Sequence, residues 1–182
     1  MFKFLFLSTL IIFVSSASTF KFRNMEEVVL MASGNSAYLK ATKNCHVGNE
    51  KIKKQAESLI KDAKTNRQKA EKIFQFVRDK IEYQYYRNTR YGSLNTLQRK
   101  KGNCVDQTHL LNALLRTAGI PARYKNGTVR FIKSGYMGHV WSYAYIDGKW
   151  KDLDTTSKMN TFDKIKNWNH AKSFELLTGI NF

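Results

Sequence analysis

Residues 102–123 read Gly-Asn-Cys-Val-Asp-Gln-Thr-His-Leu-Leu-Asn-Ala-Leu-Leu-Arg-Thr-Ala-Gly-Ile-Pro-Ala-Arg, and they predict an amphipathic helix with a cysteine in its first turn. Asn103 is a favourable N-cap residue, and the carboxylate of Asp106 suits the positive end of the helix dipole. Gly119 ends the helix and Pro121 prevents it from continuing. Apolar residues recur at helical spacing along one face, at Leu110, Leu111, Leu114, Leu115 and Ala118.

Cys104 therefore lies at the start of this helix, where unpaired backbone N–H groups and the helix dipole both favour the thiolate. His139, in Gly-His-Val-Trp, and Asp154, in Lys-Asp-Leu-Asp-Thr-Thr, follow it in the sequence. This order suggests a thiol nucleophile, its base and a residue that orients the base. Asp152 competes for the third role, because it lies two residues before Asp154 and points to the same strand face.

The N-terminus has the pattern of a signal peptide. Lys3 precedes an apolar run over residues 4–14 that only Ser8 and Thr9 interrupt, and Ser-Ser-Ala at 15–17 fits a cleavage site. The run is too short to span a bilayer comfortably, so we expect cleavage and a protein that is secreted or held at the cell surface. An uncleaved signal segment would be its link to a membrane.

The domain organisation after this signal peptide, residues 1–17, is simple. We assign residues 18–49 to an N-terminal extension and residues 50–182 to one catalytic domain, because repeats and proline-rich linkers are absent from the sequence. Apolar spacing predicts helices over 50–64 and 67–80. The aromatic and basic residues between the second of these helices and Cys104 predict an irregular approach to the cysteine.

Strands are expected after the cysteine helix, at 122–124, 128–132, 139–146 and 149–153. Asp147-Gly148 is a strong signal for a tight hairpin between the last two. Such a hairpin would return Asp154 to the side of His139. Helices followed by antiparallel strands indicate the α+β class, with the cysteine at the start of a central helix that packs on an antiparallel sheet.

Charge narrows the choice of partner. The chain has 31 lysine and arginine residues against 14 acidic ones, a net charge of +17, and loss of the signal peptide would leave +16. The basic residues are spread along the chain and form no nucleic-acid motif, so we expect no nucleic acid partner. The positive charge has two possible explanations. It attracts an anionic wall polymer, a lipid surface or an acidic substrate, or the lysine-rich helices simply present solvated faces.

The chain contains two cysteines, Cys45 and Cys104. Two cysteines in an exported protein suggest a disulfide, but that bond would consume the proposed nucleophile, and the helix start favours a free thiol at Cys104. We expect a structural or incidental role for Cys45, which has no comparable helix start. Acidic residues are few and scattered, and Cys45 with His46 falls far short of a zinc set, so we expect no metal site and no cofactor.

The remaining histidines and the tryptophans have no predicted part in the chemistry. His109 lies more than one helical turn after Cys104, so we expect it to pack or cap locally. We expect His46 and His170 at the surface. Tryptophans are more often core residues than substrate platforms, and we expect core positions for Trp141, Trp150 and Trp168.

These pieces resemble the transglutaminase-like, papain-type thiol fold. The resemblance is carried, in order, by Gly102-Asn103-Cys104, by the helix exit at 116–123, by Gly138-His139-Val140-Trp141 and by Asp154. It implies a transglutaminase-like core with Cys104, His139 and Asp154 as a catalytic triad. The family pattern of a strand-ending aspartate before small polar residues favours Asp154 for the third position.

A closer resemblance is to transglutaminase-like domains of methane-producing archaea, which include pseudomurein endoisopeptidases. Thr-Lys-Asn-Cys at 42–45, Gly-Asn-Cys-Val-Asp at 102–106 and Lys-Asn-Trp-Asn at 166–169 carry it. It implies a thiol hydrolase that cleaves the peptide cross-links of a cell wall, pseudomurein, through an acyl-enzyme. Two other functions stay open: acyl transfer from protein glutamine to an amine, and a non-catalytic basic module that binds walls.

The expected mechanism needs a site for the oxyanion of the tetrahedral intermediate. The backbone N–H of Cys104 can supply one hydrogen bond. A second donor is expected from residues 83–98, and the sequence does not choose among Tyr83, Gln84 and Asn95.

Overall fold

The computed structural model describes residues 34–182, so the predicted signal peptide and part of the predicted extension lie outside the described residues. The described part begins with a short 3-10 helix, η1 (Asn35–Leu39). Its α-helices are α2 (Glu50–Ile60), α3 (Asn66–Lys80), α4 (Gly92–Arg99) and α5 (Cys104–Thr117). Within residues 34–182, no helix combines the length and apolar character needed to cross a membrane.

The strands form two sheets. A small parallel pair consists of β1 (Glu82–Tyr83) and β2 (Lys101–Gly102). The main sheet is antiparallel, in the order β5-β4-β3-β6, and is built from β3 (Ala122–Phe131), β4 (Gly135–Ile146), β5 (Lys149–Leu153) and β6 (Trp168–Leu177).

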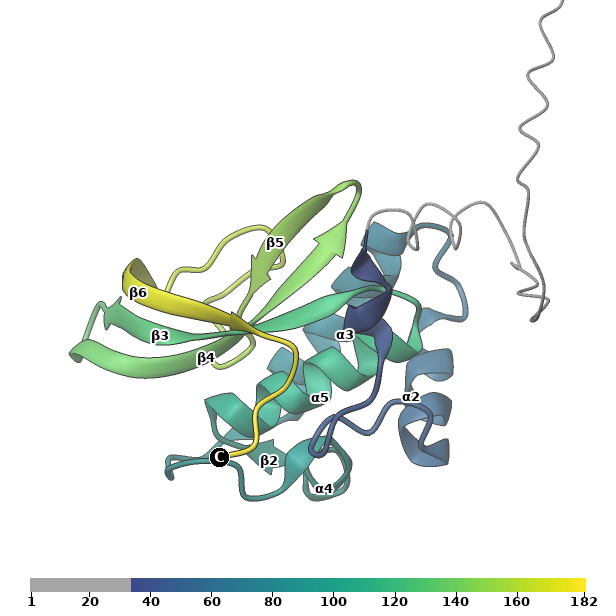
Figure 1. The fold of residues 1–182 in the computed structure, drawn as a ribbon, viewed down its shortest axis with the longest axis horizontal. Coiled ribbons are helices and arrows are strands. Elements are labelled where there is room, and N and C mark those ends of the chain that lie inside the picture. Colours follow the sequence, from purple (N-terminus) through teal and green to yellow (C-terminus); the bar gives the residue numbers. More distant parts are fainter. Residues whose placement is uncertain (1–33) are drawn as a thin grey trace, which may run out of the picture.

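Helix α5 is the centre of the molecule. It contacts β3 and β4 of the sheet, and it also contacts α2, α3 and α4. In Figure 1 the curved sheet lies above α5 and α4 lies below it. The expected α+β class, with a central helix packed on an antiparallel sheet, is therefore confirmed.

The ends of α5 follow from its sequence. The side chain of Asn103 accepts a hydrogen bond from the backbone N–H of Asp106 at 2.9 Å, so the helix begins at Cys104 as its N-cap predicts. Gly119 ends the helix in the left-handed region, at φ 80°. The predicted helix at 50–64 is shorter than expected, because the chain turns after Ile60 and the Ala63 N–H bonds the Ile60 carbonyl.

Three parts of the fold differ from the sequence-based expectation. The segment before Cys104 is not irregular, since it holds β1, α4 and β2. The two short strands expected at 122–124 and 128–132 are one strand, because Gly127 stays in the ladder opposite His139. Strand β6 was not expected, and it packs so closely on β3 that a Cβ at Gly127 would lie 2.1 Å from the Ser173 carbonyl oxygen.

The β4–β5 hairpin forms as its sequence predicts. Asp147 and Gly148 both have positive φ, at 52° and 77°, which is the backbone of a type I′ turn. Ile146 and Lys149 pair across this turn, and β5 covers Lys149–Leu153, the predicted residues. The turn therefore fixes the position of the residue that follows β5, Asp154.

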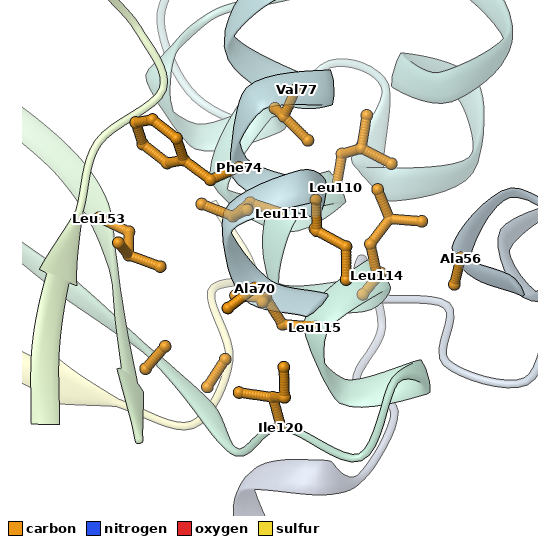
Figure 2. Packing of buried hydrophobic residues seen from close by; sticks show 14 of the residues in the cluster. Ala56, Ala70, Phe74, Val77, Leu110, Leu111, Leu114, Leu115, Ile120 and Leu153 are labelled. Atoms are coloured by element: carbon orange, nitrogen blue, oxygen red, sulfur yellow. The ribbon is translucent and has the colours of Figure 1, made fainter. Parts of the chain in front are cut away.

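The hydrophobic core lies between the apolar face of α5, the inner face of α3 and the sheet. Figure 2 shows the leucines of α5 meeting side chains of α3 and Leu153 of β5, and all of these residues are buried. Cys45 is fully buried in the same core, so part of the segment before residue 50 packs with the domain. This rigid interior holds the start of α5 beneath the sheet.

Candidate active site

Cys104, at the start of α5, lines a cleft of about 570 Å³. Its side chain is half-buried and its thiol is free. His139, on β4, lines the same cleft. The antiparallel pairing of β3 with β4 and the packing of β4 on α5 bring the two side chains to one place, although 35 positions separate them in the sequence.

His139 and Asp154 form a buried pair. Their side chains are 3% and 1% exposed, and His139 Nε2 lies 2.9 Å from Asp154 Oδ2. The other oxygen of Asp154 accepts hydrogen bonds from the backbone N–H and the hydroxyl of Thr156, at 2.9 and 2.7 Å. This leaves Nδ1 of His139 as the ring atom available to exchange a proton in the cleft.

The pair strongly favours its charged form. Burial alone would lower the pKa of His139, but the carboxylate of Asp154 and the side chain of Cys104 outweigh it and raise the pKa to about 10. Burial would raise the pKa of Asp154, but His139 and Thr156 hold it at about 2. An imidazolium that faces Cys104 at neutral pH stabilises a thiolate there.

Asp152, the alternative to Asp154, has a different position. Its Oδ1 accepts a hydrogen bond from Trp141 Nε1 at 2.7 Å and lies 2.8 Å from Lys125 Nζ. Trp141 in turn stacks on His139, with ring centroids 5.9 Å apart and an interplanar angle of 15°. Asp152 thus holds the ring that supports the imidazole and does not bond the imidazole itself.

Asp106 anchors the loop that forms one wall of the cleft. Its carboxylate is fully buried and accepts a hydrogen bond from the Tyr86 hydroxyl at 2.5 Å. It also accepts backbone N–H bonds from Arg90, Tyr91 and Gly92, the last at 2.7 Å. The sequence predicted only a dipole contact for Asp106, because nothing local shows that residues 86–92 wrap around the helix start.

Asn103 ties the same loop to the nucleophile. Its side-chain amide donates to the carbonyls of Tyr86 and Asn88, at 3.0 and 2.8 Å, while its carbonyl oxygen caps α5. Tyr86 accepts a further bond from the Asn103 backbone N–H at 3.0 Å. The residue next to Cys104 therefore serves two structural purposes, the helix start and the cleft wall.

Tyr83 is the oxyanion-donor candidate that the structure places at the cleft. It lines the cleft beside Cys104, whereas Asn95 donates to the Tyr91 carbonyl at 3.1 Å and, like Gln84, does not line the cleft. Burial, followed by the nearby Cys104, raises the pKa of Tyr83 to about 12, so its hydroxyl keeps its proton at neutral pH. It can donate a hydrogen bond to an oxyanion.

Residues 53–155 match the family model described as the transglutaminase-like superfamily. This range covers more than half of the chain and contains Cys104, His139 and Asp154. The chain belongs to the transglutaminase-like superfamily. No curated protein matches it. The narrower likeness to pseudomurein endoisopeptidases is not among these matches.

Two solved structures share the fold of this transglutaminase-like chain. One is from Cytophaga hutchinsonii and is described as a "putative cysteine protease", with a TM-score of 0.63 and 22% identity over 85% of this chain. The other is the periplasmic domain of TgpA from Pseudomonas aeruginosa, with a TM-score of 0.53 and 17% identity over 68% of this chain. The chain spans 60% and 47% of those two proteins, respectively.

The other described histidines lie outside the catalytic pair. His109 is buried between the Tyr124 hydroxyl and the Thr89 hydroxyl, at 2.9 and 3.0 Å, which is the packing role expected for it. His170 is exposed, as expected. His46 is half-buried and bonds the Ser93 hydroxyl at 2.8 Å, so its expected surface position is wrong.

Two tryptophans of the transglutaminase-like chain are not core residues. Trp141 is buried as expected, but Trp150 and Trp168 are half-buried. Trp168 begins β6 and bonds Asp154, because the long-range pairing of β6 with β3 carries it to the site. No local sequence pattern indicates this contact.

The structure also bears on the two cysteines and on the question of a metal site. Cys45 and Cys104 are both free thiols, so the disulfide alternative is excluded by the structure. Among residues 34–182, no three His, Cys, Asp or Glu side chains are grouped so that they could hold a metal ion. The cleft itself holds the Cys104 thiol beside the His139–Asp154 pair.

Proposed function

We propose that the protein is an exported cysteine hydrolase that cleaves peptide or isopeptide bonds in a cell-wall polymer, with pseudomurein as the polymer. The observation that carries the proposal is the position of Cys104, at a helix start, in one cleft with the buried His139–Asp154 pair. Membership of the transglutaminase-like superfamily supports acyl chemistry by this thiol.

The first half of the proposed reaction forms a thioester. The Sγ atom of Cys104, held as a thiolate by the His139 imidazolium, attacks the carbonyl carbon of the scissile amide. The backbone N–H of Cys104 and the Tyr83 hydroxyl donate to the oxyanion. When the C–N bond breaks, His139 Nδ1 gives its proton to the departing amine.

The second half releases the acid. Neutral His139 takes a proton from a water molecule, whose oxygen attacks the thioester carbon, and the thiolate of Cys104 leaves with the imidazolium restored. Asp154 accepts the hydrogen bond from Nε2–H, which orients the ring with Nδ1 toward the thiol. The same bond keeps neutral His139 in the tautomer whose Nδ1 can accept a proton. Each proton taken up by His139 is returned within the cycle.

Acyl transfer to an amine is the second candidate, because the superfamily match supports the same thioester and an amine can replace water. Addition of a primary amine to a working reaction separates the two. A hydrolase gives mainly the free acid, whereas an acyltransferase converts the thioester to the new amide. The non-catalytic wall-binding module is disfavoured, because simple binding has no need of the assembled cysteine, histidine and aspartate.

The wall substrate is proposed on charge and on resemblance. The net charge of +17 suits a polymer that carries carboxylates, and the predicted signal peptide would deliver the protein outside the cell. The protein and its Cys104→Ala variant, under reducing conditions, are incubated with pseudomurein-containing walls, and free amines are measured. Release by the protein alone supports the proposal. If the walls stay intact but a small reactive amide still acylates Cys104, the choice of substrate is overturned.

A further inference from the structure

None of the described residues that line the cleft at Cys104 has an acidic side chain. The other side chains that line it are aromatic, aliphatic, amide-bearing or small, and its basic side chains are those of His139 and Arg87. His139 is already paired with Asp154. Arg87 is therefore the cation that the cleft leaves available to a bound substrate.

Arg87 differs from most arginines of the chain. Within residues 34–182, all arginines other than Arg87 and Arg130 make an ion pair, a hydrogen bond or a ring contact. Arg90, three positions along the same loop, stacks over the Tyr86 ring at 4.1 Å. The side chain of Arg87 is exposed and makes no such contact with residues 34–182, although it lines the cleft.

The backbone that carries Arg87 is fixed beside the nucleophile. Asn103, which precedes Cys104, donates to the carbonyls of Tyr86 and Asn88, the two residues that flank Arg87. Asp106 binds the Tyr86 hydroxyl and the backbone further along the loop. The loop thus holds the start of the Arg87 side chain in place, and a ligand has to order only the side chain itself.

We infer that the cleft selects acyl donors that carry a free carboxylate beside the bond attacked, and that Arg87 receives this carboxylate. The planar guanidinium can bind a carboxylate by donating two parallel hydrogen bonds to its oxygens. A residue that is cross-linked through its side-chain carboxyl group, and that no further residue follows, has a free α-carboxylate. This inference, which rests on the proposed function, therefore favours isopeptide donors. The positive charge of the whole chain attracts the same substrates.

Two alkylating reagents of nearly equal size test the inference without knowledge of the natural substrate. Iodoacetate carries a carboxylate and iodoacetamide a neutral amide, and with each the Cys104 thiolate forms an S–C bond while iodide leaves. The readout is the ratio of the two alkylation rates. The variants are Arg87→Gln, Arg87→Lys and, as the matched control, Arg130→Gln, because Arg130 is also exposed and without a contact but does not line the cleft.

We expect Arg87→Gln to lower the iodoacetate-to-iodoacetamide ratio about fivefold, the size of an ion pair at a partly exposed site. Arg87→Lys retains part of the ratio, because the charge stays but the two parallel hydrogen bonds are lost. Arg130→Gln leaves the ratio unchanged, and added salt reduces it in the protein itself. An unchanged iodoacetamide rate in Arg87→Gln shows that the cleft is intact.

The two proposals fail in different ways. If Cys104 is alkylated rapidly and Arg87→Gln leaves the ratio unchanged, the carboxylate inference is overturned and the proposed function stands. A ratio that falls equally in Arg130→Gln also overturns it, since overall charge then explains the effect. If Cys104 reacts no faster than an ordinary thiol with either reagent, the proposed function itself fails.

Discussion

Trp168 Nε1 donates a hydrogen bond to Asp154 Oδ2 at 2.7 Å, and the same oxygen bonds His139 Nε2 at 2.9 Å. The indole also meets the imidazole edge to face, with ring centroids 6.4 Å apart. Trp168 is the first residue of β6, so the pairing of β6 with β3 fixes both contacts. The C-terminal strand therefore orients the carboxylate of the proposed triad.

Replacement of Trp168 by phenylalanine removes the N–H donor and keeps an aromatic ring. We expect about a tenfold lower rate of Cys104 acylation, because a hydrogen bond to a charged group contributes about 1.5 to 3 kcal/mol. The measurement is the burst rate with a reactive ester. Trp150→Phe is the matched control, since Trp150 is also half-buried and stacks on Tyr143, away from the triad. Equal rates in the two variants would contradict an orienting role.

Asp154→Asn removes the charge that raises the pKa of His139. Burial, which lowers this pKa, then dominates, and the imidazole is neutral at pH 7. The thiolate loses its cation, and loss of a triad carboxylate lowers catalysis by about 10²- to 10⁴-fold. The pH profile of Cys104 alkylation measures this directly. The protein should react at pH 6, and the variant only as pH approaches the range of an ordinary thiol; identical profiles would refute the ion pair.

The same pair predicts how stability depends on pH. The pKa of His139 is raised from 6.5 to about 10 in the folded state, so its stabilisation is complete below pH 6.5 and is lost as pH rises toward 10. The pKa of Asp154 is depressed from 3.8 to about 2, so its contribution is present above pH 3.8 and is lost as pH falls toward 2. Urea unfolding between pH 6.5 and 10 should show this decline, and His139→Asn should reduce its slope.

Asp106→Asn tests the anchor of the cleft wall. The amide keeps the size of the side chain but loses its charge and presents an N–H group to backbone N–H donors. We expect the free energy of unfolding to fall by about 3 kcal/mol, because the backbone N–H donors lose a buried charged acceptor. Tyr86→Phe removes the bond that the Tyr86 hydroxyl donates to Asp106 and the bond that it accepts from the Asn103 backbone N–H, and it should cost about 1 to 3 kcal/mol. Denaturant midpoints that match the unmodified protein would exclude the anchoring role.

Much of the candidate site could be predicted because its signals are local. The N-cap at Asn103 fixes Cys104 as the first residue of α5, since capping depends on residues within one turn. The Asp147-Gly148 turn needs only two residues to set the β4–β5 register, and that register returns Asp154 to His139. These short-range rules place Cys104 at the helix start and Asp154 beside His139, whereas the packing of β4 on α5, a contact between distant segments, brings His139 to Cys104.

The remaining features depend on contacts between distant segments. Trp168 reaches Asp154 only through the pairing of β6 with β3, and the mostly exposed residues of β6 show no clear apolar alternation. Asp106 binds a loop that begins 20 positions earlier, and its spacing in the sequence does not reveal that contact. Gly127 lies within a continuous strand, and the neighbouring backbone of β6 lies too close to leave room for a Cβ there, a packing relation that no local pattern encodes.

The most direct test of the central claim follows the mass of the intact protein during reaction with p-nitrophenyl acetate. Cys104 should gain one acetyl group at neutral pH and lose it as water enters, while Cys104→Ala gains none and Cys45→Ala behaves as the unmodified protein. Cys45 serves as the control because it is the second free thiol and is fully buried. Acetylation that persists in Cys104→Ala, or a Cys104 that never acetylates, would contradict a thioester mechanism at this cleft.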